Sequence, residues 1–283
     1  MRILRTVDEL RAWSRSIRCA GDRTQRIGLV PTMGALHAGH ASLMRAARAA
    51  GDRYAVSIFV NPTQFGPGED YARYPRTFAS DCEMAEAEGA DVVFAPGVEE
   101  LYPAGAATIV DVEGLSDRLD GQSRPGHFRG VATVVAKLLT AAEPDRAYFG
   151  QKDAAQVAVL RRLVTDLRLA TELVVCPIVR ESDGLALSSR NTYLSSDERA
   201  RALVLSRAVR RVEAMAAAGE HRAEVLLAAS RETFAAEPSV RVDYAALVDW
   251  TTLAPVAEAA PGTLFAVAAW VGATRLIDNA LIS

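Results

Sequence analysis

Short apolar runs alternate with amphipathic stretches through the first two thirds of the chain. Five runs are nearly continuous in apolar side chains, as in strands that are covered on both faces: residues 27–30, 54–60, 91–95, 146–149 and 173–179. A sixth run, residues 108–112, shows the pattern more weakly. Five stretches have apolar positions at helical spacing: residues 7–18, 39–50, 77–88, 131–142 and 150–169. This alternation predicts an α/β fold with a doubly wound parallel sheet.

The pattern changes after about residue 179. Ser195 and Glu198 form a capping-box pair that begins a long helix, and further elements follow: a helix to about residue 217, a second helix over 222–236, and strands over 241–247 and 263–271. We therefore predict two domains, a sheet domain over residues 1–178 and a smaller α+β domain over residues 179–283.

Local signals also set the ends of some elements in the first domain. Thr6 and Glu9 form another capping-box pair at the start of the first helix, and Gly21 with Asp22 is expected to end that helix. The first predicted strand is expected to break at Pro31.

Composition excludes several classes of protein. Of the 283 residues, 50% are hydrophobic and 24% charged, and the net charge of -3 comes with no strongly basic arm for nucleic acid. No uncharged run is long enough to cross a membrane, and the N-terminus carries charges where a signal peptide needs an apolar core. Three cysteines without a C-x-x-C pair favour a reducing compartment. We expect a cytoplasmic protein that binds neither nucleic acid nor membrane.

The stretch I-G-L-V-P-T-M-G-A-L-H-A-G-H, residues 27–40, joins a predicted strand to a predicted helix through a turn of small residues. The first N–H groups of a helix lack intrahelical partners, so this connection is a ready anion site. His37 and His40 are three residues apart, and both imidazoles can reach one ligand. Exposed histidines on an ordinary connection fit as well. Zinc is a weaker alternative, because His127 is the only further candidate ligand before His221.

Amide side chains follow the next predicted strand. Asn61 and Gln64 lie in N-P-T-Q-F, which also fits an ordinary turn. Amides bind hydroxyls and carboxylates without a formal charge. A carboxylate held in this way keeps more of its reactivity as a nucleophile than one that is clamped by arginine.

Two later segments add groups that suit phosphate. In G-Q-K-D, residues 150–153, Lys152 meets phosphate as a point charge, Asp153 caps the helix or holds a cation, and Gln156 shares the face of Lys152. In D-G-L-A-L-S-S-R-N, residues 183–191, two hydroxyls and an arginine stand at the predicted domain junction. A capped helix and a polar linker are the plainer interpretations. Together the segments predict a nucleoside triphosphate site with an uncharged acceptor pocket, although no P-loop motif is present.

The motifs together resemble the pantothenate synthetases (pantoate–β-alanine ligases) of the HxGH nucleotidyltransferase superfamily. The resemblance covers essentially the whole chain through these segments, in order: P-T-M-G-A-L-H-A-G-H, S-I-F-V-N-P-T-Q-F, Y-P-R-T, S-R-P-G-H-F-R-G-V, F-G-Q-K-D, D-G-L-A-L-S-S-R-N and T-R-L-I-D-N. It implies a Rossmann-like first domain that binds nucleotide and pantoate, a C-terminal domain that closes over ATP, and a homodimer. The implied reaction joins ATP and (R)-pantoate into pantoyl adenylate with release of pyrophosphate, and β-alanine then displaces AMP. Mg²⁺ accompanies ATP.

The resemblance also implies roles for individual residues. His40 is the implied proton donor, and the implied catalytic set is His37, His40, Lys152, Ser188, Ser189 and Arg190. The implied ATP site is Met33, Gly34, Ala35, Leu36, His37, Ala38, Gly39, His40, Gly150, Gln151, Lys152, Asp153, Val179, Leu187, Ser188, Ser189 and Arg190. Gln64 would hold pantoate and later β-alanine, Gln156 would hold pantoate, and Asn61 would line that pocket.

One segment departs from the family pattern. After G-Q-K-D the family usually has an aromatic residue and then two glutamines, whereas this chain has Ala154, Ala155 and Gln156. The functional glutamine is kept, but the neighbouring packing is smaller, so a looser substrate pocket is expected. Two other functions remain open: another HxGH nucleotidyltransferase, which the glutamine pair disfavours, and a nucleotide sensor without chemistry, which the complete motifs disfavour.

Overall fold

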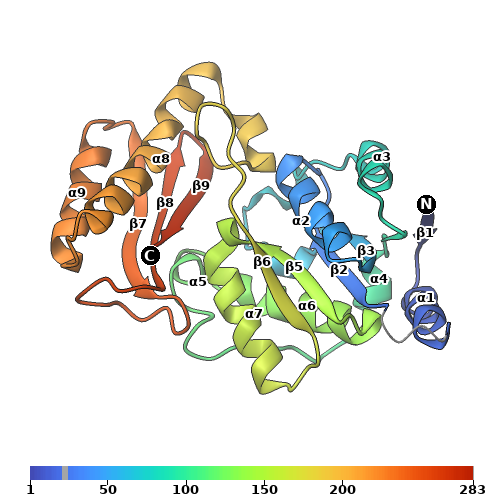
Figure 1. Cartoon of the computed structure of the whole chain (residues 1–283). Helices are drawn as coiled ribbons and strands as arrows, with labels where there is room; N and C mark the ends of the chain where they lie inside the picture. The colour runs from blue at the N-terminus through green and yellow to red at the C-terminus, as the bar shows by residue number, and fades with distance from the viewer. Residues whose placement is uncertain (21–24, 283) are drawn as a thin grey trace.

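The computed structural model describes residues 1–20 and 25–282, which form two sheets (Figure 1). The larger sheet is parallel and has six strands: β1 (Arg2–Leu4), β2 (Ile27–Thr32), β3 (Arg53–Ile58), β4 (Val92–Phe94), β5 (Arg146–Gly150) and β6 (Glu172–Cys176). Their order is β1-β4-β3-β2-β5-β6. The chain runs outward from β2 through β3 to β4 on one side and from β5 to β6 on the other, and β1 adds the edge strand beside β4. The predicted doubly wound parallel sheet is confirmed.

Helices cover both faces of this sheet because its strands bury side chains on both sides. Leu29 of β2 packs in the core with α1, α6 and α7, whereas its neighbour Val30 points to the opposite face, against α2 and α3. The helices of this part are α1 (Val7–Cys19), α2 (Ala38–Ala49), α3 (Phe78–Glu88), α4 (Val98–Leu101), α5 (Asp120–Ser123), α6 (His127–Ala142) and α7 (Ala154–Asp166). Short 3₁₀ turns join them: η1 (Pro62–Gln64), η2 (Asp70–Ala72) and η3 (Gln151–Asp153).

The smaller sheet is antiparallel and lies beside the first (Figure 1). Its strands are β7 (Val240–Asp249), β8 (Thr263–Val271) and β9 (Thr274–Leu281), and it follows η4 (Ser189–Tyr193), α8 (Ser196–Ala217) and α9 (Ala223–Ala235). Phe265 of β8 packs with α8 and α9 in a second core. The adjacent Leu264 and Ala266 belong to the core of the larger sheet, so β8 joins the two parts of the molecule.

Both predicted capping boxes are confirmed, at the starts of α1 and α8. The predicted stop of α1, Gly21 with Asp22, lies outside the described residues. β2 does not break at Pro31 but continues to Thr32, because β3 accompanies the whole strand while β5 pairs only with Gly28 and Leu29. The proline therefore stands beyond the last β2–β5 pair, where its missing N–H costs no ladder bond.

The strand predicted over residues 108–112 is wrong. Within the described structure this segment has no ladder partner; the N–H of Val110 donates instead to the hydroxyl of Thr133 at 3.0 Å. The helix predicted over residues 131–142 begins one turn earlier, because α6 starts at His127. The strand predicted over residues 173–179 ends earlier, as β6 stops before Pro177.

Two strands, β1 and β9, are not evident from the sequence pattern. β9 pairs with β8 through a tight hairpin whose turn, Gly272 and Ala273, lies between the paired residues Val271 and Thr274. Gly272 has a φ of 56°, a left-handed conformation that glycine adopts at low cost. No helix in the described part of the chain is long and apolar enough to span a membrane.

Candidate active site

Loops that follow β2, β3 and β5 meet the stretch after β6 at the carboxyl ends of the strands. They line a cavity of about 220 Å³, the strand-end cavity, beside the point where the strand order reverses. Most of the residues singled out from the sequence line it: Met33, His37, Gly39, His40, Asn61, Gln64, Gly150, Lys152, Asp153, Gln156, Val179, Leu187, Ser188, Ser189 and Arg190. Five residues of the implied ATP site line neither this cavity nor the next one described: Gly34, Ala35, Leu36, Ala38 and Gln151.

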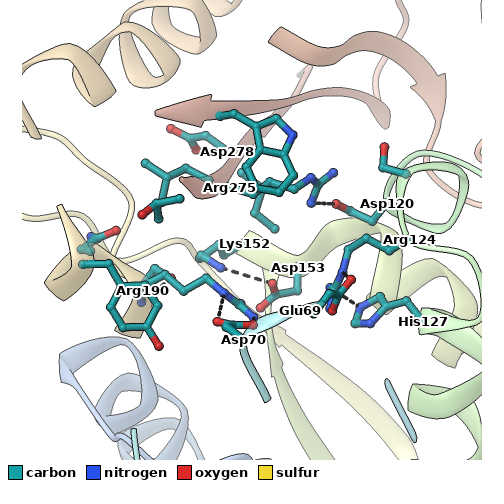
Figure 2. A pocket seen from close by; sticks show the side chains of 18 of the residues that line it. Glu69, Asp70, Asp120, Arg124, His127, Lys152, Asp153, Arg190, Arg275 and Asp278 are labelled. Atoms are coloured by element: carbon teal, nitrogen blue, oxygen red, sulfur yellow. Dashed lines mark hydrogen bonds and ion pairs between the residues drawn. The ribbon is translucent and has the colours of Figure 1, made fainter. Parts of the chain in front are cut away.

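A second cavity of about 410 Å³, the outer cavity, lies between these loops and β9. Lys152, Asp153 and Arg190 line both cavities, so the two adjoin at these side chains. Figure 2 shows Lys152 and Asp153 in the middle of the outer cavity, with the Arg190–Asp70 pair on one side and a second group of charged side chains on the other. The arrangement gives a charged passage that leads to the strand-end cavity.

His37 is the N-cap residue of α2, and His40 lies in the first turn of that helix. Nδ1 of His37 accepts the N–H of Gly39 at 3.1 Å, and Nδ1 of His40 accepts the N–H of His37 at 3.3 Å. Each neutral ring must then carry its hydrogen on Nε2. The N–H groups of His40 and Ala41 donate to the carbonyl of His37, at 2.8 and 3.0 Å. Several N–H groups at the start of the helix are thus bonded within the turn, and the two imidazoles add Nε2–H donors.

The two histidines are neutral near pH 7. Burial and the nearby charge of Lys152 lower the pKa of His37 to about 4. Burial and the neighbouring His37 lower the pKa of His40 to about 3. Gly39 permits this close pair, because a Cβ at that position would stand 2.8 Å from Cε1 of His37. Each ring thus offers an uncharged Nε2–H donor.

The turn before the histidines is anchored away from the cavity. The buried carboxylate of Asp81, in α3, accepts the N–H of Ala35 at 3.0 Å and that of Leu36 at 2.8 Å. Gly34 has a φ of 81°, and a Cβ there would stand 2.9 Å from the Asp81 carboxylate. Asp81 was not singled out from the sequence. A turn that contains glycine needs an acceptor for its exposed N–H groups. The chain has several acidic residues, and the sequence does not show which of them accepts these N–H groups.

The amide pair after β3 is oriented by its own hydrogen bonds. Asn61 is buried, and its Nδ2 donates to Oε1 of Gln64 at 3.1 Å and to the carbonyl of Gly130 at 3.1 Å. This fixes the amide of Gln64 so that its Nε2, 3.1 Å from the sulfur of Met33, is the group offered to the cavity. Gln64 therefore presents N–H donors, which suit a carboxylate.

Two residues to which the sequence analysis gave no substrate role hold the backbone of Gln64. The ring nitrogen Nδ1 of His127 lies 2.8 Å from the Gln64 carbonyl, and Nη2 of Arg124 donates to the same oxygen at 3.3 Å. Burial and the Arg124 charge lower the pKa of His127 to about 4, so the neutral ring donates through Nδ1. Arg124 is itself paired with Glu69 at 2.6 Å. Both residues lie in the segment S-R-P-G-H-F-R-G-V. Its polar composition is the feature of the sequence that could have indicated them.

Lys152 and Asp153 lie in η3, directly after β5. Nζ of Lys152 is 3.3 Å from Oδ1 of Asp153. Burial is the largest single influence and raises the pKa of Asp153, but the charge and hydrogen bond of Lys152 and the charge of Arg190 together outweigh it. The net effect lowers that pKa, so the carboxylate is ionised. Asp153 occupies the N-cap position of α7 without a side-chain cap bond, so it is not the helix cap that was one expectation. Gln156 lies one helical turn further on and lines both cavities.

The stretch after β6 supplies the remaining side chains. The N–H of Leu187 donates to the carbonyl of Val179 at 3.0 Å, which joins two residues of the cavity wall. Ser189 lies 3.3 Å from the hydroxyl of Tyr74. Arg190 is already engaged, because its Nε and Nη2 donate to the carboxylate of Asp70 at 2.9 and 3.0 Å.

Metal ligation by the histidine pair gains no support from the geometry. Among residues 1–20 and 25–282 no group of three or more His, Cys, Asp or Glu side chains is arranged to hold a metal ion. His127, the third candidate, is used under Gln64. The histidines are therefore better interpreted as hydrogen-bond donors than as zinc ligands.

Comparison with known proteins decides the family. A family model described as pantoate-beta-alanine ligase matches residues 2–281. The chain belongs to the pantoate–β-alanine ligase family. The enzyme is therefore an ATP-dependent ligase of pantothenate biosynthesis, as the sequence motifs indicated, and an adenylate intermediate is implied by the family.

Individual relatives agree with this assignment. The pantothenate synthetase of Acidobacterium capsulatum is 61% identical over 290 residues, which cover 100% of this chain and 97% of the relative. The crystal structure of pantothenate synthetase from Thermus thermophilus superposes with a TM-score of 0.92 at 47% identity, covering 99% of both chains. The ligase from Francisella tularensis, solved as a complex with β,γ-ATP and β-alanine, has a TM-score of 0.80 and 35% identity, covering 99% of this chain and 97% of that one.

Proposed function

We propose that the strand-end cavity carries out both steps of the family's reaction on this chain. Pantoate and ATP give pantoyl adenylate and pyrophosphate there, and β-alanine then displaces AMP. The observation that supports this most is the composition of the cavity wall: two uncharged amides, Gln64 and Gln156, face the same space as His37, His40 and Lys152. The amides can bind a carboxylic acid, and the histidines and Lys152 can bind a phosphate chain beside it.

The phosphate chain of ATP lies along His37, His40 and Lys152 in this proposal. The two Nε2–H groups donate to phosphate oxygens, while Lys152 supplies positive charge. When the bond between the α- and β-phosphates breaks, charge gathers on the departing pyrophosphate, and each preorganised donor aimed there is worth roughly 10²–10³ in rate. Ser188 and Ser189, from the stretch after β6, add hydroxyl donors to the same cavity. His40 thus acts by hydrogen bonding, and binding of the polyanion raises its pKa toward the range of a proton donor.

Pantoate binds through Gln64 and Gln156, and one of its carboxylate oxygens attacks the α-phosphorus in line with the leaving pyrophosphate. A free guanidinium would hold the carboxylate's charge and weaken it as a nucleophile. The two arginines of the cavity wall, Arg124 and Arg190, are each paired with an acidic residue. The acid is therefore positioned by neutral donors.

β-Alanine reaches the adenylate through the outer cavity. Its amine attacks the carbonyl carbon, the bond from that carbon to the phosphate oxygen breaks, and AMP leaves with the oxygen. Gln64 is freed from the carboxylate when the adenylate forms, so it can hold β-alanine in the second step, as the family resemblance implies. Asn61 supports both steps by keeping the Gln64 amide oriented.

Mg²⁺ accompanies ATP in the proposed mechanism. This ion prefers oxygen ligands and keeps several waters, so phosphate oxygens and one or two carboxylates would hold it. Asp153 fits that demand, because it is ionised, lines both cavities and is bonded only to Lys152 among the described side chains. Asp70 and Glu69 fit less well, since each is paired with an arginine. When bound there, the ion would neutralise charge on the leaving pyrophosphate.

Three wider features belong to the same proposal. Residues 1–178 form the domain that binds nucleotide and pantoate, and residues 179–283 form a domain that closes over ATP. Ser188 and Ser189, which belong to the second range and line the strand-end cavity, support this division. The enzyme works as a homodimer, for which the exposed apolar side chain of Ile109 is a candidate contact. It acts in the cytoplasm, in agreement with three cysteines that are all free thiols.

The experiment that tests the proposal is an assay of pyrophosphate and AMP with ATP, pantoate and β-alanine, each omitted in turn. Pyrophosphate release is expected to require ATP and pantoate, and catalytic AMP release to require β-alanine as well. Pyrophosphate release driven by a nucleotide acceptor without pantoate would contradict it and favour another nucleotidyltransferase. Absence of any AMP with all three substrates would favour a sensor without chemistry.

A further inference from the structure

The side chain of Asn279, in β9, reaches across to the turn that carries Lys152. Its Nδ2 donates to the backbone carbonyl of Gln151 at 3.0 Å and to that of Lys152 at 2.9 Å. Its Oδ1 accepts from the side chain of Gln151 at 3.3 Å. Asn279 is only 3% exposed, so both amide hydrogens and the oxygen of a buried group are spent on this one turn.

The turn needs outside support. η3 spans only Gln151–Asp153, too short for a stable ladder of its own, and Asp153 has a non-helical φ of -96° and ψ of 53°. Small rotations of this backbone swing the long side chain of Lys152 through the cavity. Bonds to two consecutive carbonyls are therefore an effective way to fix the direction in which Lys152 leaves the chain.

The residue before Asn279 holds a second segment of the same site. The carboxylate of Asp278 accepts from Nη1 and Nη2 of Arg180 at 2.7 and 2.9 Å. Arg180 belongs to the stretch that runs from β6 toward Ser188. Successive residues of a strand point to opposite faces, so the D-N pair of T-R-L-I-D-N holds one cavity segment with each side chain.

We propose that Asn279 is a positioning residue for adenylate formation: the smaller sheet, through this amide, fixes η3 so that Lys152 meets the phosphate chain of ATP. Asn279 does not touch the reacting atoms and acts through Lys152. The inference rests on the proposed function, because it assigns Lys152 to the triphosphate. It assigns the T-R-L-I-D-N motif a role in the chemistry, in addition to its role in the fold and in packing.

The test is a double-mutant cycle on ATP binding with Asn279→Asp and Lys152→Ala. Aspartate is nearly isosteric but has no hydrogens to donate and places charge against two carbonyls. We expect Asn279→Asp to weaken ATP binding by about 10-fold, roughly the effect of two lost hydrogen bonds, while adenosine binding and the KM for pantoate change by less than about 2-fold. In the Lys152→Ala background the same change should cost less than about 2-fold, because the group it positions is gone.

Trp250→Phe is the matched control. The indole Nε1–H of Trp250 donates to the carbonyl of Ala154 at 3.0 Å, so it also ties the smaller sheet to the start of α7 but does not hold Lys152. ATP affinity in this variant should stay within about 3-fold of the wild type. Asn279→Ser, which keeps one donor, serves in the same cycle if the aspartate variant does not fold.

Three results would overturn the proposal. They are equal loss of ATP and adenosine binding in Asn279→Asp, effects of Asn279→Asp and Lys152→Ala that simply add, and a loss in Trp250→Phe as large as that in Asn279→Asp. Wild-type enzyme that releases no pyrophosphate with pantoate would count against the proposed function instead, so the two failures are distinguishable.

Discussion

Replacing Gly130 with alanine is expected to impair the use of pantoate while the fold survives. Gly130 lies where α6 crosses the loop that carries Gln64. A Cβ at this position would stand 2.3 Å from the carbonyl oxygen of Thr63 and 2.6 Å from the backbone nitrogen of Gln64. Non-bonded carbon contacts lie near about 3.5 Å, so the loop has to withdraw by about 1 Å.

That displacement sets the size of the effect. A shift of about 1 Å in a group that positions a reactant costs on the order of 10²-fold in rate. Alanine is also favoured over glycine within a helix by up to ~1 kcal/mol, which offsets part of the strain. We therefore expect kcat/KM for pantoate, measured by pyrophosphate release, to fall about 10²-fold while the KM for ATP changes by less than about 3-fold.

Gly97→Ala is the control for this substitution. Gly97 has a φ of -72°, and a Cβ there would meet nothing within 4 Å, so the variant should behave as the wild type. Circular dichroism and the thermal midpoint report whether Gly130→Ala is folded. A folded Gly130→Ala enzyme with kcat/KM for pantoate within about threefold of the wild type would refute the reasoning. Loss of ATP affinity with pantoate affinity intact would refute it as well.

The remaining predictions concern the same site. His40→Ala should slow adenylate formation by about 10²–10³-fold in a rapid-quench assay, whereas His221→Ala, an exposed histidine, should not; near-normal turnover in His40→Ala would contradict the assigned role. Gln64→Ala should raise the KM for pantoate more than that for ATP in steady-state assays, and the reverse order would exclude Gln64 as the acid-binding amide. His40 and His127 have low pKa values in the folded protein, whereas in the unfolded chain the pKa of a histidine is about 6.5. Just below pH 6.5 the unfolded chain therefore binds more protons than the folded protein. The urea midpoint should therefore fall as pH drops from about 6.5 to 5, and it should fall less steeply in His127→Gln; equal slopes would contradict the neutral buried ring.

Local sequence signals predicted much of the fold. Capping boxes and helical spacing locate α1 and α8 because those signals act within one turn of chain. The strand order, in contrast, follows from contacts between distant segments, and β1 with only three residues gives no pattern of its own. Residues 108–112 resemble a strand in composition but bond to α6, an outcome set by tertiary contact rather than by propensity.

The site was predicted unevenly for a related reason. Residues that face the cavity, such as His40 and Gln64, stand in motifs whose chemistry can be interpreted directly. Residues that hold those motifs do so across the fold: Asp81 anchors the glycine turn from α3, and Asn279 supports η3 from the other sheet. A single sequence contains no sign of which distant acceptor or amide meets which turn. The motifs thus point to groups that face the cavity, and the structure adds the residues that contact those motifs from other elements.

The central claim is that a carboxylate oxygen of pantoate attacks the α-phosphorus of ATP in the strand-end cavity before β-alanine reacts. Pantoate labelled with ¹⁸O in both carboxylate oxygens tests this most directly, with the products analysed by mass spectrometry. We expect one labelled oxygen in AMP and one in pantothenate, because the bridging oxygen leaves with the nucleotide. If AMP carries no ¹⁸O, the oxygen lost from pantoate has left by another route, and this result would contradict the adenylate mechanism.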